Sequence, residues 1–256
     1  MQDKSYHKLL SCVLEILKMM IESGAEIYRV EESANIIFRA YGIKNADVYA
    51  TTSNIIVSLE TEDGEIKTHT RRISGISTNI EKIHRLNSLV RKMSCETPSV
   101  TEIRDELDSI YNAKNFSGIV NIIVYGVIAG AFYFFFGGRH PIEAVYSVLI
   151  GLVTGVINTA FEKLKPNKIL IKFICSFTAC TLIFILYKLA LLSNVDYLII
   201  ANIMTLIPGV GLTNALRDLF VGDSVSGVLR MIEAALFAIA IASGYLAVSF
   251  IFGGVI

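Results

Sequence analysis

The hydrophobic and polar positions divide the chain into a front part with amphipathic patterns and a back part with long apolar runs. Five runs are long enough to cross a bilayer, since roughly 20 apolar residues rising about 1.5 Å each span the hydrocarbon core. These runs are Ile119–Phe136, Pro141–Phe161, Ile169–Leu192, Tyr197–Leu216 and Ala234–Ile256. Lipid offers no hydrogen-bond partners to the backbone, so each run is predicted to be a transmembrane helix.

The front part alternates between helical and strand-like patterns. Helical spacing of apolar residues occurs in residues 7–22, Ala25–Tyr41 and Ile80–Met93, and Pro98 opens a last helix that ends near Tyr111. Strand-like runs occur at Ala46–Thr51, Asn54–Glu60 and Glu65–Arg71, with a hairpin turn at residues 61–64. The sequence therefore predicts a small cytoplasmic α/β domain in residues 1–115, followed by an α-helical membrane bundle of five transmembrane helices in residues 116–256.

Charge follows the same division. The chain has 53% apolar and 18% charged residues and a net charge of zero, and residues 1–117 hold 32 of its 46 charges. This composition excludes a purely soluble enzyme, a disordered chain and a basic nucleic-acid binder, so no nucleic-acid partner is expected. The partner of the back part is the lipid bilayer.

Loop charges predict the orientation in the membrane. With the front part in the cytoplasm, the inner loops carry Lys163, Lys165, Lys168, Arg217 and Arg230, and the outer side carries Arg139 and Lys188. The excess of positive charge on one side predicts a cytoplasmic N-terminus and a C-terminus outside.

Two pairs of glycines with GxxxG spacing lie in the first two predicted spans, at Gly126/Gly130 and Gly151/Gly155. Small residues at this spacing let helix backbones approach closely. The pairs are consistent with packing within the bundle or with a subunit interface.

The fourth predicted span is interrupted by Pro208, Gly209 and Gly211. Proline cannot donate a hydrogen bond to the carbonyl of Met204, four residues earlier, and the glycines permit a complete break in the helix. A broken helix directs free carbonyls from one half and a positive N-terminus from the other to one depth of the bilayer, as in secondary transporters. The alternative is a simple kink whose free backbone groups are satisfied by Thr205 and neighbouring helices.

Polar residues flank the break on both sides. The predicted substrate-binding residues are Asn202, Thr205, Pro208, Gly209, Thr213, Asn214, Arg217 and Asp218. Arg217 and Asp218 have two interpretations, because they can close the helix at the cytoplasmic interface or Arg217 can attract an anionic substrate.

Catalytic signals in the front part are weak. Glu26, Arg29 and Arg71 are candidates for a polar site there, although a solvated helix face and an ion pair at a strand end are the favoured explanation. The sequence has no phosphate-binding loop, no nucleophile elbow and no metal-ligand spacing, so no cofactor or metal is predicted. Transport would then be driven by an ion or substrate gradient.

Two segments resemble the threonine/serine exporter family. They are SGAEIYRVEES at residues 23–33 and LIPGVGLTNALRDLFVGD at residues 206–223, supported by Thr52-Ser53-Asn54 and by Thr70-Arg71-Arg72. Within the second segment, Pro208, Gly209, Leu212, Asn214, Ala215 and Asp218 match the family's membrane element. Within the first, Gly24, Ala25, Glu26 and Arg29 match its soluble-domain element.

The chain is most similar to the split-subunit form of this family, in which a soluble N-terminal domain precedes five spans. The resemblance implies an exporter in the inner membrane for threonine and serine or for a dicarboxylate such as succinate. It also implies a second small membrane subunit, because fused members have more spans than this chain. The alternatives are a membrane-anchored hydrolase-like enzyme, active in its cytoplasmic domain, and a sensor or scaffold.

Overall fold

The computed structural model describes residues 2–60, 64–113, 116–164 and 167–252. Within them the chain divides into two compact units. One unit combines Met1–Lys114 with Gly209–Ile232, and the other combines Asn115–Pro208 with Glu233–Ile256. The first unit thus contains a late segment of the chain as well as the whole front part.

The first unit begins with helices and a small sheet. Its elements are α1 (Gln2–Glu22), α2 (Ile27–Ala40), β1 (Ala46–Ala50), β2 (Asn54–Glu60), β3 (Ile66–Arg72), α3 (Ile80–Glu96), α4 (Val100–Tyr111), α9 (Gly209–Val221) and the first residues of α10 (Ser224–Ile251). The three strands form an antiparallel sheet in the order β1-β2-β3. The three predicted strands are therefore confirmed, and most of the predicted turn between β2 and β3 lies outside the described residues.

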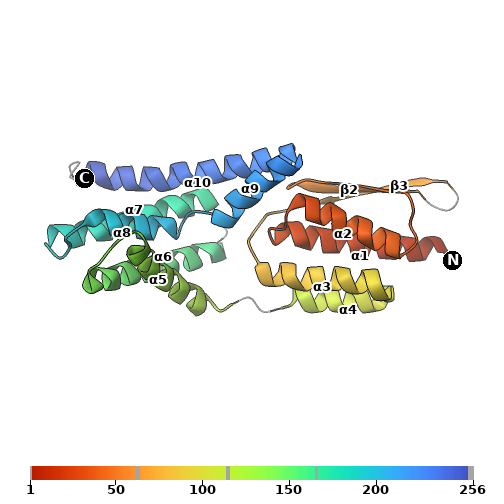
Figure 1. Cartoon of the computed structure of the whole chain (residues 1–256), viewed down its shortest axis with the longest axis horizontal. Coiled ribbons are helices and arrows are strands. Elements are labelled where there is room, and N and C mark those ends of the chain that lie inside the picture. Colours follow the sequence, from red (N-terminus) through yellow and green to blue (C-terminus); the bar gives the residue numbers. More distant parts are fainter. Residues whose placement is uncertain (1, 61–63, 114–115, 165–166, 253–256) are drawn as a thin grey trace. The chain divides into compact units, whose positions relative to one another are not determined.

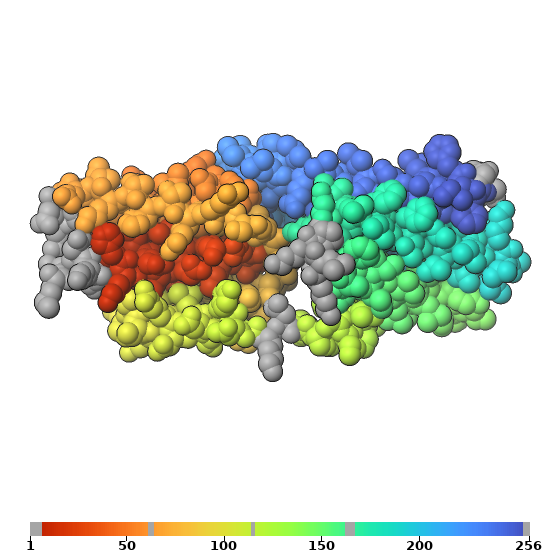
Figure 2. Space-filling model, turned by 180° about the vertical axis from the view of Figure 1, so that it is seen from behind, coloured from red at the N-terminus to blue at the C-terminus, as the bar shows by residue number. Residues whose placement is uncertain are grey.

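The front elements form three layers, with the sheet on one side of α1 and α2 and with α3 and α4 on the other (Figures 1 and 2). Alternate residues of β2 (Ile55, Val57 and Leu59) are buried, as expected for a strand with one face on a helical layer. The amphipathic pattern of α1 predicted one buried face. The helix lies in the middle layer and buries other faces as well, through Cys12, Ile16 and Met19.

The second unit contains the apolar helices. They are α5 (Gly118–Phe135), α6 (Pro141–Leu164), α7 (Lys168–Lys188), α8 (Val195–Met204) and the remainder of α10. Among the described residues, four helices are long and apolar enough to cross a membrane, or five if the bent pair α8 and α9 is counted as one span. A mostly helical membrane protein is thus confirmed, and the count of five depends on that pair.

Helices α5 and α6 pack closely through the two glycine pairs. A Cβ atom at Gly151 would lie 2.7 Å from the Cβ of Ala129 and 2.8 Å from the carbonyl oxygen of Tyr125. At Gly130 it would lie 2.6 Å from Cγ2 of Val148. The glycine pairs therefore serve packing within the chain, the first of the two interpretations of the sequence pattern.

The start of α10 differs from its prediction. The helix begins at Ser224, ten residues before the predicted span at Ala234. Only Arg230 and Glu233 carry charge in this added part, and neither breaks a helix. Hydropathy located the uncharged part of α10, whereas the charges of Arg230 and Glu233 led to the preceding residues being assigned to an inner loop.

Candidate functional site

The eight predicted substrate-binding residues belong to both units. Asn202, Thr205 and Pro208 lie at the end of α8 in the unit of apolar helices, and the other five lie on α9 in the unit that contains the front elements. Each group has its own set of contacts.

At the end of α8, most of the backbone carbonyls that lack a partner further along the helix accept local hydrogen bonds. The hydroxyl of Thr205 donates to the carbonyl of Asn202 over 2.6 Å, and the amide of Leu206 donates to the carbonyl of Ile203 over 2.9 Å. The carbonyl of Met204, predicted to lose its partner, accepts a long bond of 3.4 Å from the amide of Ile207. The helix thus ends in a tightened turn before Pro208, with local bonds in place of the missing one.

Asn202 is buried beside α6 and its amide nitrogen is fully used. Nδ2 donates to the carbonyl of Leu198 over 3.0 Å and to the hydroxyl of Ser147 over 3.1 Å. The hydroxyl of Ser147 in turn donates to the carbonyl of Ala129 over 3.0 Å. Asn202 is 1% exposed, and its Oδ1 has no hydrogen-bond partner in the part of the chain that the structure describes. Ser147 was missed as a partner, because nothing in the sequence indicates which helix faces Asn202.

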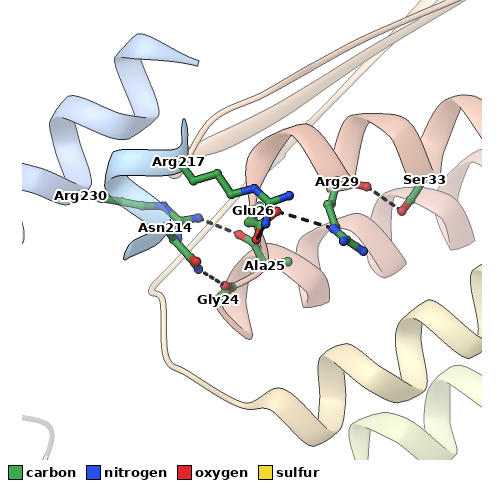
Figure 3. Close-up of polar contacts among 8 residues, drawn as sticks. All are labelled: Gly24, Ala25, Glu26, Arg29, Ser33, Asn214, Arg217 and Arg230. Atoms are coloured by element: carbon green, nitrogen blue, oxygen red, sulfur yellow. Dashed lines mark hydrogen bonds and ion pairs between the residues drawn. The ribbon is translucent and has the colours of Figure 1, made fainter. Parts of the chain in front are cut away.

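On α9, two of the predicted residues contact the turn between α1 and α2, here called the α1–α2 turn (Ser23–Glu26). Asn214 donates from Nδ2 to the carbonyl of Gly24 over 2.9 Å, and Arg217 binds the Glu26 carboxylate over 2.8 Å (Figure 3). The hydroxyl of Thr213 instead donates to the carbonyl of Gly209 in its own helix. As substrate-binding residues all of these remain predictions.

Asp218 and Arg230 form a buried ion pair beside the same turn. The Arg230 Nε lies 3.2 Å from Oδ2 of Asp218, and the two side chains are 7% and 1% exposed. The Arg230 guanidinium also donates to the carbonyl of Ala25 over 2.8 Å, and the amide of Ile27 donates to the Asp218 carboxylate. A carboxylate at the first turn of α2 is further stabilised by the helix dipole.

The sequence pattern placed Arg230 incorrectly. Arg230 and Glu233 are three residues apart, a spacing that favours a surface ion pair. However, Arg230 is buried and pairs with the Asp218 carboxylate, whereas Glu233 is exposed. A single arginine within a long apolar helix was the signal that could have indicated a buried partner.

Gly24 allows the α1–α2 turn to adopt its shape. Its φ is +91°, a region that side chains rarely occupy, and a Cβ there would lie 2.8 Å from the carbonyl oxygen of Ser77. The segment after β3 holds the turn from that side, because the amide of Ser77 donates to Glu22 and the amide of Asn79 donates to Ser23. The turn is therefore held by two separate parts of the chain.

Replacing Gly24 with alanine should destabilise the first unit. The positive φ alone costs about 1–2 kcal/mol for a residue with a Cβ, and the contact with Ser77 adds to that cost. Gly42→Ala is the matched control, because Gly42 has φ +77° and nothing within 4 Å of its Cβ position. Thiol labelling of the buried Cys12 in the full chain, with the exposed Cys95 replaced by serine, measures the opening of this unit. Equal labelling rates in the two variants would show that the Ser77 contact carries no cost.

The three soluble-domain candidates are only partly brought together. Glu26 lies 3.6 Å from the Arg29 guanidinium and also binds Arg217, whereas Arg71 lies exposed on β3 opposite Ile55. No group of three or more possible metal-binding side chains occurs among the described residues.

Glu31 is a further polar residue of α2, from the same charge cluster as Glu26 and Arg29. Its carboxylate accepts a hydrogen bond from the Ala50 backbone over 2.8 Å and so joins α2 to β1. Burial raises the pKa of the Glu31 carboxyl, with a smaller rise from Asp223, against the lowering effect of the Ala50 bond. This residue is thus a structural link beside the α1–α2 turn.

The contacts of the turn join two distant sequence segments. Gly24, Ala25 and Glu26 come from the first of the segments that resemble an exporter family, and Asn214 and Arg217 come from the second. The separation between Gly24 and Asn214 is 190 residues. The two motifs therefore form one structural element.

Comparison with known proteins agrees with this resemblance. Residues 11–252 match the family described as "Putative threonine/serine exporter". The chain is similar to the "Probable succinate transporter subunit YjjP" of Klebsiella aerogenes, with 23% identity over 244 residues that cover 94% of this chain and 93% of that protein. No solved structure matches the chain.

Proposed function

Because the chain belongs to the threonine/serine exporter family, we propose that it is one subunit of a secondary exporter for small carboxylate-bearing metabolites. Membership in the family and the apolar helices make it a multi-pass membrane transporter. The remaining parts of the proposal concern the substrate path, the partner subunit and the orientation.

The observation that carries the proposed substrate path is the interruption between α8 and α9 at Thr205–Pro208. The carboxyl end of α8 offers carbonyl oxygens, and the first amides of α9 have no acceptor within their own helix. The positive end of a helix favours a carboxylate. The substrate would therefore meet Asn202, Thr205 and Pro208 on one side of the break. On the other side it would meet Gly209, Thr213, Asn214, Arg217 and Asp218.

The substrate is threonine or serine, or a dicarboxylate such as succinate. The family description supports the first class, and the name of the Klebsiella aerogenes relative supports the second. A helix N-terminus accepts a carboxylate from either class, so the choice depends on what binds the other end of the molecule.

The partner is a second small membrane subunit, as the word "subunit" in the name of the relative supports. We place the complex in the inner membrane, with the domain of residues 1–115 in the cytoplasm and the C-terminus outside. The excess of lysine and arginine in the inner loops supports this orientation. The contacts of the α1–α2 turn with α9 suggest that the cytoplasmic domain holds the second half of the broken span in place.

Replacing Pro208 with alanine tests the substrate path. Alanine restores a backbone amide that can donate to Met204, so the break can close into a continuous helix. Release of threonine, serine and succinate is measured from cells that express the chain together with its neighbouring membrane gene. We expect at least a tenfold loss of release with unchanged insertion into the membrane.

Pro141→Ala is the matched control, because Pro141 begins α6, where proline is normally tolerated and its removal leaves the helix intact. Wild-type release by the Pro208 variant would place the substrate path elsewhere. No release of any of the three metabolites by the wild-type pair would overturn the exporter proposal.

A further inference from the structure

The cluster around Asn202 and Ser147 has only acceptor capacity left. Each hydrogen-bond donor in it is already used: both Nδ2 hydrogens of Asn202, the hydroxyl of Ser147 and the hydroxyl of Thr205. Oδ1 of Asn202 retains two lone pairs, and the Ser147 oxygen retains one. The cluster can therefore accept a donor or coordinate a cation, but it has no donor for an anion.

The orientation of the Asn202 amide is fixed by its neighbours. Nδ2 faces the carbonyl of Leu198 over 3.0 Å. Exchanging the nitrogen and oxygen would place Oδ1 against that carbonyl, where two acceptors repel each other. The unpaired atom at this position is therefore an oxygen.

Leaving this oxygen unpaired is costly. Asn202 is 1% exposed and Ser147 is fully buried, so water outside the protein cannot satisfy Oδ1. A buried polar atom without a partner destabilises the folded state, and it does so more strongly where no water is available. In addition, the negative end of the α8 dipole lies in the same turn and favours positive charge.

We propose that Asn202 Oδ1 and Ser147 Oγ form an occluded binding site for a monovalent cationic group. The group is either a sodium ion that drives transport or the ammonium group of an amino-acid substrate. This inference rests on the proposed exporter function and assigns the cationic half of the cargo to α8. A carboxylate then binds elsewhere, since every donor of the cluster is occupied.

Occlusion fits a role in transport. The site opens only if α8 moves away from α6, and α8 ends at the interruption that begins with Thr205. A helix with a free end shifts at lower cost than the middle of a continuous span, because fewer backbone bonds must break. Binding and movement of α8 are thereby linked.

The test is ligand-dependent thermal unfolding of the purified full chain in detergent. Unfolding is followed with a thiol-reactive dye that reports exposure of the buried Cys175 and Cys180 on α7, in a Cys95→Ser background. The probes are sodium chloride against choline chloride at equal ionic strength, and L-threonine against succinate, both in choline chloride. A ligand that binds only the folded chain raises the melting temperature, and the rise grows with the ratio of ligand concentration to dissociation constant.

Asn202→Leu should weaken the binding of whichever probe shifts the melting temperature by about 10- to 100-fold. This is the effect expected for losing a hydrogen bond to a charged group. Ser147→Ala should weaken it less, and it keeps the Asn202 amide in case the leucine variant does not fold. Thr181→Val is the matched control, because the hydroxyl of Thr181 bonds the Phe177 carbonyl of its own helix and not the Asn202 cluster.

A shift with sodium identifies a coupling cation, and a shift with L-threonine in choline identifies the substrate ammonium. The inference is overturned if only succinate shifts the melting temperature, if no probe does, or if Asn202→Leu responds like the wild type. Metabolite release from cells tests the exporter function separately. Intact release without any cation-dependent shift would therefore overturn this inference alone.

Discussion

Replacing Arg230 with methionine is expected to destabilise the first unit by about 3–5 kcal/mol, the range for removing one partner of a buried ion pair. Asp218 would lie buried at 1% exposure without the nearby guanidinium, and the carbonyl of Ala25 would lose its donor. Methionine has a similar length, so most of the packing is kept and the loss reports the polar contacts.

Arg217→Met is the matched control for this prediction. Arg217 contacts the same α1–α2 turn through Glu26, but its side chain is 50% exposed. Exposed ion pairs contribute only about 0–1 kcal/mol, since water and salt screen them. The rate at which Cys12 is labelled in the full chain, in a Cys95→Ser background, measures both effects.

The double variant Asp218→Asn with Arg230→Met gives a second comparison. It removes the uncompensated charge, so it should be more stable than Arg230→Met alone. If Cys12 were labelled at the same rate in Arg230→Met and Arg217→Met, the buried pair would contribute no more to stability than the exposed one, contrary to this prediction.

The second large effect is expected from Gly151→Leu in α6. Even a Cβ atom at this position would lie 2.7–3.0 Å from Ala129, Tyr125 and Gly126 on α5, and two of these contacts are with backbone atoms. The leucine therefore forces the two helices apart. Overpacking of this kind costs about 1–3 kcal/mol and occasionally more, and we expect the upper part of that range.

Val153→Leu serves as the control, because it places a leucine two residues away on the same helix where the side chain is 40% exposed. Labelling of Cys175 and Cys180 on α7 measures the stability of this unit. If the Gly151 variant labelled as slowly as the Val153 variant, α5 and α6 would be able to separate at little cost, contrary to the expectation.

Sequence patterns predicted the helices and strands well where the apolar residues recur with the period of one kind of element. The strands were predicted to within about one residue, and Pro208 and Gly209, which have direct conformational effects, lie where α8 gives way to α9. Only one of the buried faces of α1 was predicted, because the pattern does not indicate that a helix lies between two layers.

The partners of polar residues were not predictable in the same way. Asn214 and Arg217 were recognised as unusual, but their contacts with Gly24 and Glu26 depend on how distant segments meet. Arg230 paired with Asp218, twelve residues earlier, and not with the nearby Glu233. Local spacing describes one helix at a time, whereas these contacts are made between helices.

The two-part composition of the first unit has a consequence for the order in which the chain folds. Gly24 and Asn214 are separated by 190 residues. At a synthesis rate of about 5–20 residues per second, roughly 10–40 seconds pass between them on the ribosome. During that interval the carbonyls of Gly24 and Ala25 lack the donors that Asn214 and Arg230 later supply. The front domain is thus made first but completed late, after the apolar helices α5 to α8 have been synthesised.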